Sequence, residues 1–305
     1  MESVDILIIG QGPAGLSSAI YTARAGMRTL ILGCAPKVAG DYEIDNYFGF
    51  TETITGKDLI ERGKAQAAKF GANMRCDRVL GIHQNDTGAF VAKTEDNEIE
   101  AASIILATGV SRIRPGISNL SDYEGKGVSY CVSCDGFFMR GKPVVVVGEG
   151  NFAANQALEL LQYTSDVKIC SQGKELSISE DFLYRLEENK IPTLEDKIVT
   201  LAGENGLETV HMESGQKIDA QGLFVAMGQA SSSDFAYSLG LVRNGQFIET
   251  DREQRTNVPG IFAAGDCVGR FLQISVAVGE GALAGRAAIN HFKERRRALL
   301  DKEAK

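Results

Sequence analysis

Two cysteines separated by two residues, with an acid directly behind the second, are the residues of this chain best suited to chemistry. They are Cys131 and Cys134, followed by Asp135. Such a pair can cycle between dithiol and disulfide through attack of a thiolate on a sulfur atom. The adjacent carboxyl group can give or take the proton that the cycle requires. The spacing therefore predicts a redox-active disulfide.

Other interpretations of the cysteines remain open at this point. A Cys-x-x-Cys pair can be half of a zinc site, or two buried structural cysteines. We expect no metal, because the sequence has no second such pair and its three histidines are scattered. Asp135 can cap a helix as well as carry a proton. The remaining cysteines have no partner at short spacing and are predicted to be small apolar fillers: Cys34, Cys76, Cys170 and Cys267.

A strand, a glycine-rich turn and a helix open the chain. The apolar run Val4–Ile9 predicts a buried strand, Leu16–Ala25 a helix and Thr29–Leu32 the next strand. The turn between the first strand and the helix reads G-x-G-x-x-G over Gly10–Gly15, which predicts a dinucleotide whose pyrophosphate lies at the helix start. The acid expected after the second strand is missing, since Gly33-Cys34 stand there.

A second unit of this kind follows the cysteine pair. Its strand is Pro143–Val147, its turn Gly148–Ala153 reads G-x-G-x-x-A, and its next strand is Val167–Cys170. Glu149 stands in the middle of the turn, where its carboxylate is expected to repel phosphates. The pattern predicts the fold more strongly than it predicts a bound nucleotide.

Two later strand ends carry further motifs, Ala107-Thr108-Gly109 after 103–106 and Gly265-Asp266 after 260–264. With them and the features above, the chain resembles the low-molecular-weight thioredoxin reductases over nearly its whole length. The resemblance implies an α/β fold with two Rossmann-like three-layer dinucleotide-binding domains, the second inserted in the first. It also implies FAD in the first site and a homodimer.

The resemblance assigns roles to individual residues. Cys134 would face the flavin, Cys131 would attack the disulfide of thioredoxin, and Asp135 would supply the proton. Asp266 would bond to the ribityl chain. The residues expected to bind FAD are Gly10, Gly12, Pro13, Ala14, Gly15, Asn46, Ala107, Thr108, Gly109, Gly265, Asp266, Gln273 and Ile274. Phe48 and Leu272 depart from the family pattern beside Asn46 and Gln273.

The arginines that clamp the 2′-phosphate of NADPH in this family are absent. Ser171-Gln172-Gly173 stand in their place, and Asn155 and Gln156 replace paired glutamates. These departures resemble those of the ferredoxin-dependent flavin thioredoxin reductases, so we expect reduced ferredoxin as donor. The alternatives are an NAD(P)H-dependent thioredoxin reductase, a dithiol oxidase using oxygen, and a non-enzymatic flavin redox sensor.

The expected FAD domain comprises residues 1–115 and 244–305, and the insert with the redox disulfide comprises 116–243. Hinges are expected at Arg114–Gly116 and Asn244-Gly245, because glycine and proline interrupt regular structure there.

A net charge of −8 over 305 residues argues against a nucleic-acid partner. No apolar run approaches the roughly 20 residues of a membrane span, and no signal peptide precedes the first strand, so we expect a cytoplasmic protein. Basic residues form candidate docking positions for an acidic partner such as ferredoxin: Arg270, Arg286, Lys293, Arg295, Arg296 and Arg297.

Overall fold

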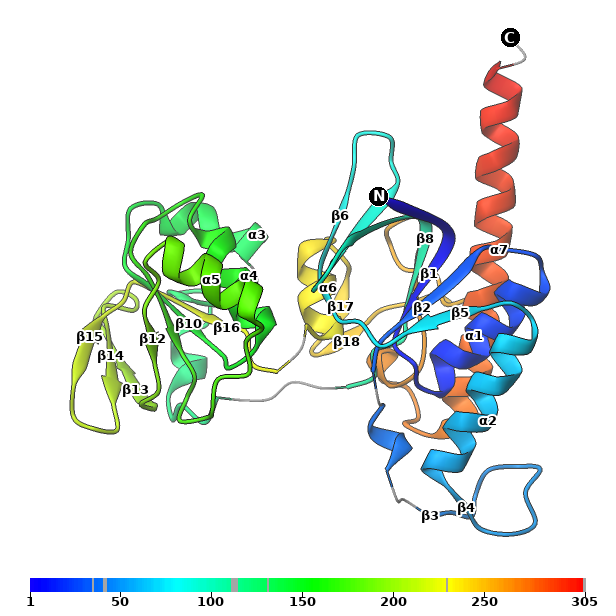
Figure 1. The fold of residues 1–305 in the computed structure, drawn as a ribbon, viewed down its shortest axis with the longest axis horizontal. Coiled ribbons are helices and arrows are strands. Elements are labelled where there is room, and N and C mark those ends of the chain that lie inside the picture. The colour runs from blue at the N-terminus through cyan, green and yellow to red at the C-terminus, as the bar shows by residue number, and fades with distance from the viewer. Residues whose placement is uncertain (35, 41–42, 111–114, 131, 229, 304–305) are drawn as a thin grey trace. The chain divides into compact units, whose positions relative to one another are not determined.

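The computed structural model describes residues 1–34, 36–40, 43–110, 115–130, 132–228 and 230–303. The chain divides into two compact units (Figure 1). The first unit comprises Met1–Ser111 and Ser231–Lys305, and the second comprises Arg112–Ala230. The second unit is therefore inserted into the first along the chain.

A seven-stranded sheet organises the first unit, with the strand order β5-β2-β1-β8-β7-β6 and β19 paired to β8. Strands β5, β2, β1, β8 and β19 run parallel to one another, whereas β7 pairs antiparallel with β8 and β6 antiparallel with β7. Its strands are β1 (Glu2–Ile9), β2 (Thr29–Leu32), β5 (Asn73–Arg75), β6 (Val79–Gln84), β7 (Phe90–Thr94), β8 (Glu98–Leu106) and β19 (Ile261–Ala263). Two hairpins, β3 (Glu43–Ile44) with β4 (Ile54–Thr55) and β17 (Arg243–Asn244) with β18 (Phe247–Ile248), complete the strands described in this unit.

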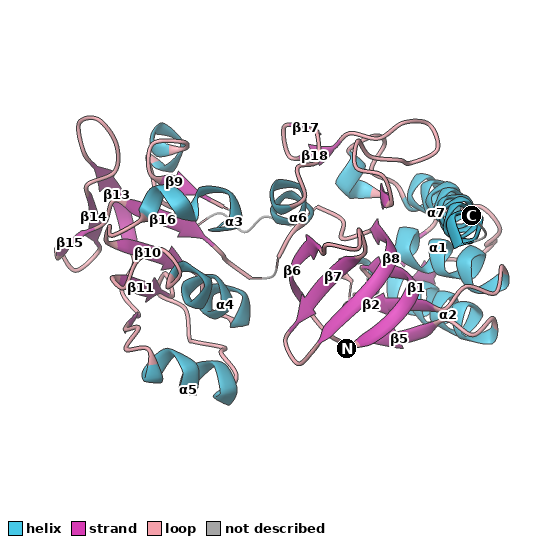
Figure 2. Ribbon diagram, turned by 90° about the horizontal axis from the view of Figure 1, so that it is seen from above, coloured by secondary structure: helices cyan, strands magenta, loops and turns pink. Residues whose placement is uncertain are grey.

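Small residues let two helices of the first unit pack closely. Helices α1 and α7 lie side by side next to the sheet with α2 (Figures 1 and 2). A side chain at Gly281 of α7 would place its Cβ 2.2 Å from the Ala14 carbonyl oxygen of α1, and Ser18 Oγ donates to the Gly281 carbonyl over 2.8 Å. The helices of this unit are α1 (Pro13–Arg24), η1 (Lys37–Ala39), α2 (Gly56–Lys69), α6 (Ser232–Ser238), η4 (Asp266–Val268) and α7 (Ile274–Glu303).

The second unit has a five-stranded parallel sheet with the order β12-β11-β10-β16-β9 and an antiparallel sheet β13-β14-β15. Its strands are β9 (Val128–Ser129), β10 (Val144–Val147), β11 (Val167–Cys170), β12 (Thr193–Leu194), β13 (Ile198–Ala202), β14 (Thr209–Met212), β15 (Lys217–Asp219) and β16 (Gly222–Val225). Its helices are η2 (Leu120–Tyr123), α3 (Val132–Asp135), η3 (Gly136–Met139), α4 (Asn151–Leu160) and α5 (Glu180–Glu188).

Each unit has its own apolar core. Ile8, Ile105 and Phe262 belong to that of the first unit, and Val147 and Leu223 to that of the second. Two α/β sheets whose central strands are parallel, each with a glycine turn after one of these strands, confirm the fold class predicted from the sequence. Within the part of the chain that the structure describes, no helix is both long and apolar enough to cross a membrane.

The second unit ends at Ala230, whereas the sequence suggested residue 243. Residues 231–243 belong with the first unit, where Asn257 Oδ1 accepts a hydrogen bond from the Val242 amide over 2.8 Å. Asn244 ends β17 and Gly245 follows it in the turn to β18, so the structure places both residues within the first unit, and the hinge expected there stays a prediction. Glycine occurs in hairpin turns and in linkers alike, so composition did not separate them. The other expected hinge falls partly on residues 111–114, outside the described part of the chain.

Candidate active site

Three parallel strands of the first unit bring the predicted cofactor residues to one edge of the sheet. Ile9 of β1 is in register with Leu106 of β8, and Leu106 with Ala263 of β19. The segments that follow these strands are Gly10–Gly15, Ala107–Gly109 and Gly265-Asp266. Ligands of open parallel sheets bind at such an edge.

The turn at Gly10 packs closely against the backbone that follows β8 and leaves no room for a side chain. Gly10 has φ of +115°, and an added Cβ would lie 2.2 Å from the Ala107 carbonyl oxygen. Helix α1 begins at Pro13, and no side chain caps it at Gly12. Its first amide groups and its positive dipole end suit a pyrophosphate. Thr108 Oγ1 is buried and has no hydrogen-bond partner among the described residues. A turn of this shape with an unpaired hydroxyl beside it fits FAD.

Asp266 follows the third of these strand ends, and its carboxyl group is partly buried. Burial raises the pKa of Asp266 above its usual value. Behind it lies Glu280 of α7, a residue that the sequence analysis missed. Glu280 Oε2 accepts the Gly265 amide over 2.8 Å, and Oε1 accepts Arg270 over 3.2 Å. Glu280 is 5% exposed, and its hydrogen bond to the Gly265 amide fixes the Gly265-Asp266 turn from the interior side. A charged residue among the alanines and glycines of 277–287 is the signal that could have revealed it.

Asp266→Asn is expected to weaken FAD binding by about tenfold or more, because a hydrogen bond to a charged group contributes roughly 1.5–3 kcal/mol.

The same substitution should stabilise the apoprotein relative to wild type as the pH rises. The raised pKa of Asp266 means that the folded apoprotein holds this proton more tightly than the unfolded chain, so its ionisation costs stability as the pH rises through the folded value. The melting temperature of the Asp266→Asn apoprotein, relative to wild type, should therefore increase between pH 4 and pH 7. A difference that is independent of pH would contradict this.

The remaining expected flavin contacts come together at the start of α7. Asn46 Nδ2 donates to Gln273 Oε1 over 3.1 Å, which joins two segments 227 residues apart. Ile274 begins α7 directly after Gln273. The residues that depart from the family pattern are both exposed here, Phe48 at 97% and Leu272 at 48%. The described residues thus place Asn46, Gln273 and Ile274 in one neighbourhood of the first unit.

The predicted redox centre falls within the second unit. Cys131 and the side chain of Cys134 fall outside the described part of the chain. The short helix α3 (Val132–Asp135) carries Cys134. Gln156 of α4 lies beside the start of this helix, where its Oε1 accepts the Val132 amide over 3.4 Å. Gln156 is buried, so the residue that replaces a family glutamate serves here to hold the cysteine segment.

Asp135 is bound by a neighbouring strand. Ser129 Oγ of β9 donates to Asp135 Oδ2 over 2.5 Å, and Ser129 is buried. The Asp135 side chain makes no capping hydrogen bond to η3, although the residue precedes that helix. The carboxylate is therefore oriented by Ser129, a residue that the sequence analysis had not considered. Its position six residues upstream gave no local signal.

Asp135→Asn is expected to lower turnover by about 10²–10⁴-fold while FAD stays bound, because a positioned acid contributes about that much to proton transfer. Ser129→Ala is the matched variant, since it keeps the carboxylate and removes the hydroxyl that orients it. We expect a smaller loss and a shifted pH–rate profile for Ser129→Ala. Steady-state rates from pH 5 to pH 9 measure both effects. Equal rates in all three proteins would leave Asp135 without a role in proton transfer.

In the second glycine turn, the side chain of Glu149 already engages two nearby hydrogen-bond donors. Glu149 Oε1 accepts Lys174 Nζ over 2.7 Å, and Oε2 accepts the Gly228 amide over 3.4 Å. The repulsion expected between Glu149 and phosphates is therefore weaker than the sequence suggested, because Lys174 balances the charge of Glu149. A pyrophosphate would instead have to displace a carboxylate that already engages the nearby donors.

Gln172 and Ser171, which stand where the family has arginines, face inward. Gln172 Nε2 donates to the carbonyl oxygens of Pro115 and Ile198 over 2.9 and 2.7 Å, and its Oε1 accepts the Ile198 amide over 3.0 Å. Ser171 is fully buried. Both side chains are part of the interior, so neither is available for a 2′-phosphate.

The cysteine predictions are partly wrong. Cys34 and Cys76 form a disulfide, although both were expected to be apolar fillers. They are 42 residues apart in sequence but follow β2 and β5, which are neighbouring strands. Cys170 and Cys267 are free and buried as expected, and burial raises the pKa of the Cys267 thiol to about 12.

Comparison with known proteins agrees with this architecture. The family model described as pyridine nucleotide-disulphide oxidoreductase matches residues 4–281. A thioredoxin reductase of Peptoclostridium acidaminophilum is 36% identical over 308 residues, covering 94% of this chain and 97% of that protein.

Two solved structures are similar over almost the whole chain. The atypical thioredoxin reductase TRi from Desulfovibrio vulgaris Hildenborough is 64% identical with a TM-score of 0.94, covering 95% of this chain and 98% of that one. A ferredoxin-flavin thioredoxin reductase from Clostridium acetobutylicum is 30% identical with a TM-score of 0.71, covering 97% and 99%.

These matches confirm the resemblance inferred from the motifs, and with it FAD as the cofactor. The chain therefore belongs to the pyridine nucleotide-disulphide oxidoreductases and, among them, to the thioredoxin reductases, which are FAD-dependent disulfide oxidoreductases.

Proposed function

We propose that this enzyme reduces thioredoxin through Cys131 and Cys134 with electrons from reduced ferredoxin rather than from NADPH. The observation that carries the choice of donor is the Glu149 carboxylate, which engages Lys174 and the Gly228 amide in the second glycine turn. The buried Gln172 supports the same conclusion. The likeness to a ferredoxin-flavin thioredoxin reductase is a further argument.

Three residues carry separate steps of the proposed reaction: Cys131, Cys134 and Asp135. FAD, when bound, accepts electrons singly or in pairs and so can link a one-electron donor to a disulfide. The Cys131 thiolate attacks the disulfide of thioredoxin and forms a mixed disulfide, and Cys134 resolves it and releases the dithiol. Asp135, oriented by Ser129, supplies the proton to the departing sulfur.

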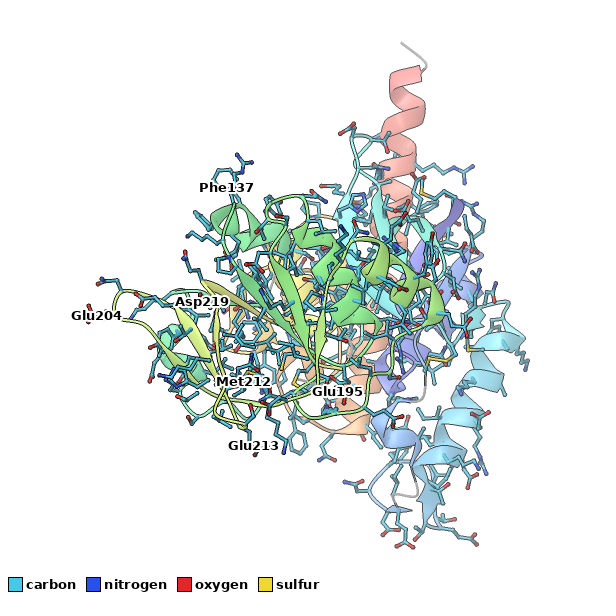
Figure 3. All side chains as sticks on the ribbon, turned by 60° about the vertical axis from the view of Figure 1, so that its left-hand side comes forward. Phe137, Glu195, Glu204, Met212, Glu213 and Asp219 are labelled. Carbon is cyan, nitrogen blue, oxygen red and sulfur yellow. A yellow bond between two sulfur atoms is a disulfide. The ribbon has the colours of Figure 1, made fainter. Side chains whose placement is uncertain are left out.

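An exposed aromatic pair beside the redox centre suits a protein substrate. Phe137 and Phe138 lie two and three residues after Asp135 and are 60% and 64% exposed. Figure 3 shows Phe137 pointing away from the ribbon of the second unit. The Arg140 guanidinium lies 5.0 Å from the centre of the Phe137 ring. Aromatic and arginine side chains are enriched in protein–protein interfaces, so we assign thioredoxin docking to this surface.

The candidate basic positions differ in how far they are available to ferredoxin. Arg270 binds Glu280, Arg286 binds Glu253, and Arg295 donates to the carbonyl oxygens of Thr87 and Gly88. Lys293, Arg296 and Arg297 are exposed on the last part of α7. That part of the helix extends beyond the sheet of the first unit (Figure 1). We therefore place the donor contact at Lys293, Arg296 and Arg297.

Reduced ferredoxin should support thioredoxin reduction, and reversing these charges should slow it. We expect Lys293→Glu/Arg296→Glu/Arg297→Glu to lower the rate by about tenfold at low salt, since exposed charges each contribute roughly 0.2–1 kcal/mol. The difference should shrink as salt screens the contact. Flavin bleaching in an anaerobic stopped-flow instrument measures the effect.

The matched control reverses three exposed charges elsewhere, Lys57→Glu/Lys217→Glu/Arg252→Glu. It changes the net charge equally and should retain most of the rate. Equal losses in both triple variants would contradict the docking position, and no bleaching by ferredoxin would contradict the donor. The homodimer and the cytoplasmic location stay predictions from the sequence.

A further inference from the structure

The Cys34–Cys76 disulfide lies at the edge of the sheet where the cofactor site begins. Cys34 comes two residues after β2 and Cys76 directly after β5, and their Cα atoms are 4.4 Å apart. In dinucleotide-binding folds the residue that contacts the cofactor's ribose comes from the end of the second strand. This chain has no acid there and has one half of a disulfide instead.

The disulfide can be reached from solvent. Cys76 is exposed and Cys34 is partly buried. Exposed disulfides are the labile and regulatory ones, whereas protected disulfides resist reduction. Asp77 follows Cys76 as Asp135 follows Cys134, and Asp77 Oδ1 is buried with no hydrogen-bond partner among the described residues. The pair thus shares one feature with the predicted redox centre, a cysteine followed directly by an acid.

Hydrogen bonds connect this disulfide to the turn that receives the pyrophosphate. Gln11, in the middle of that turn, donates from Nε2 to the Arg75 carbonyl oxygen over 2.8 Å. The Gly33 amide donates to the same oxygen over 3.2 Å, and the Gly10 amide donates to the Leu32 carbonyl over 2.7 Å. Arg75 precedes Cys76, and Gly33 precedes Cys34. The disulfide therefore joins the two backbone segments that hold the glycine turn in place.

We propose that Cys34 and Cys76 form a second thiol–disulfide exchange site, which accepts electrons from dithiols and loosens FAD when it opens. Reduced thioredoxin, the product of the enzyme's own reaction, belongs to this class of dithiol. The enzyme would then lose its cofactor more readily when reduced thioredoxin accumulates. The inference rests on FAD lying against Gly10–Gly15 and is independent of the identity of the electron donor.

The exchange balances without a further reactant. A thiolate of the dithiol attacks the sulfur of Cys76, the more exposed residue of the pair. A bond forms between these sulfurs, and the bond from Cys76 to Cys34 breaks. Cys34 leaves as a thiolate and takes up a proton. The second thiolate of the dithiol then attacks its own partner sulfur and releases Cys76, which also takes up a proton. The dithiol ends as a disulfide, and its two protons and two electrons reside on Cys34 and Cys76.

The test uses the FAD-loaded Cys131→Ser/Cys134→Ser protein, in which the central pair cannot exchange. Reduced thioredoxin is added anaerobically, thiols are alkylated without denaturation, and the Cys34 and Cys76 peptides are identified by mass spectrometry. Flavin fluorescence after dilution gives the rate of FAD release. We expect both cysteines to become alkylated and FAD to leave about tenfold faster, which corresponds to about 1.4 kcal/mol.

A second protein with Cys34→Ser/Cys76→Ser added is the matched control, and it should release FAD rapidly with or without thioredoxin. Should that variant fail to fold, the reduction of the native pair still decides the question. A pair that stays oxidised in the folded protein, under thioredoxin that reduces insulin in parallel, overturns the exchange site. A pair that opens without any change in FAD release overturns the coupling to the cofactor.

Discussion

Replacement of either Cys131 or Cys134 by serine is expected to abolish thioredoxin reduction while the protein keeps its FAD. A serine hydroxyl is not ionised at neutral pH and cannot form a disulfide, so either change breaks the two-electron cycle. We expect rates to fall on the order of 10³-fold or more, as for other residues that act as one catalytic unit. FAD should stay, because the residues that fit it lie in the first unit and the cysteines in the second.

The two serine variants should differ in what they trap. Cys134→Ser leaves the attacking thiol and should accumulate a mixed disulfide with thioredoxin, visible on a non-reducing gel. Cys131→Ser should not. Cys170→Ser is the control, because Cys170 is buried in the same unit and its thiol donates to the Asp196 carbonyl, a bond that a hydroxyl can replace. The reverse trapping pattern would exchange the two roles, and activity in both variants would place the redox centre elsewhere.

NADPH at millimolar concentration is expected to reduce the flavin on the order of 10³-fold more slowly than reduced ferredoxin does. Each missing hydrogen bond to a charged phosphate costs roughly 1.5–3 kcal/mol, and about 1.4 kcal/mol corresponds to a factor of ten. The clamp arginines are absent, Gln172 is committed to Pro115 and Ile198, and Glu149 engages Lys174.

The variant Glu149→Gln separates charge from shape in this prediction. It removes the carboxylate and keeps the side-chain volume, and we expect only a small gain with NADPH because Gln172 and Ser171 remain buried. NADH should be equally ineffective, which would exclude a weak NADH site. Rapid bleaching of the flavin by NADPH, with half-saturation in the micromolar range, would contradict the proposal. Failure of both donors, with oxygen consumed in the presence of a small dithiol, would favour the dithiol oxidase.

The family, the fold class and the cofactor could be predicted from the sequence because their signals are local. A buried strand, a glycine turn and a helix follow one another within 25 residues around Gly10 and again around Gly148. The glycines are required where backbone atoms approach too closely for a Cβ, and this requirement acts within one turn. The motif at Asp266 is local in the same sense.

The arrangement around these motifs was decided by the tertiary structure, since it depends on which strands become neighbours. Cys34 and Cys76, 42 residues apart in sequence, meet because β2 and β5 are paired strands. Glu280 reaches Gly265 because α7 packs back on the sheet edge. Gln172 points inward because the strands around it leave backbone groups of Pro115 and Ile198 to be paired. Such contacts depend on distances in space between residues far apart in the chain. The sequence can mark a residue such as Glu280 as unusual for its surroundings, but residue type and spacing do not identify its partner.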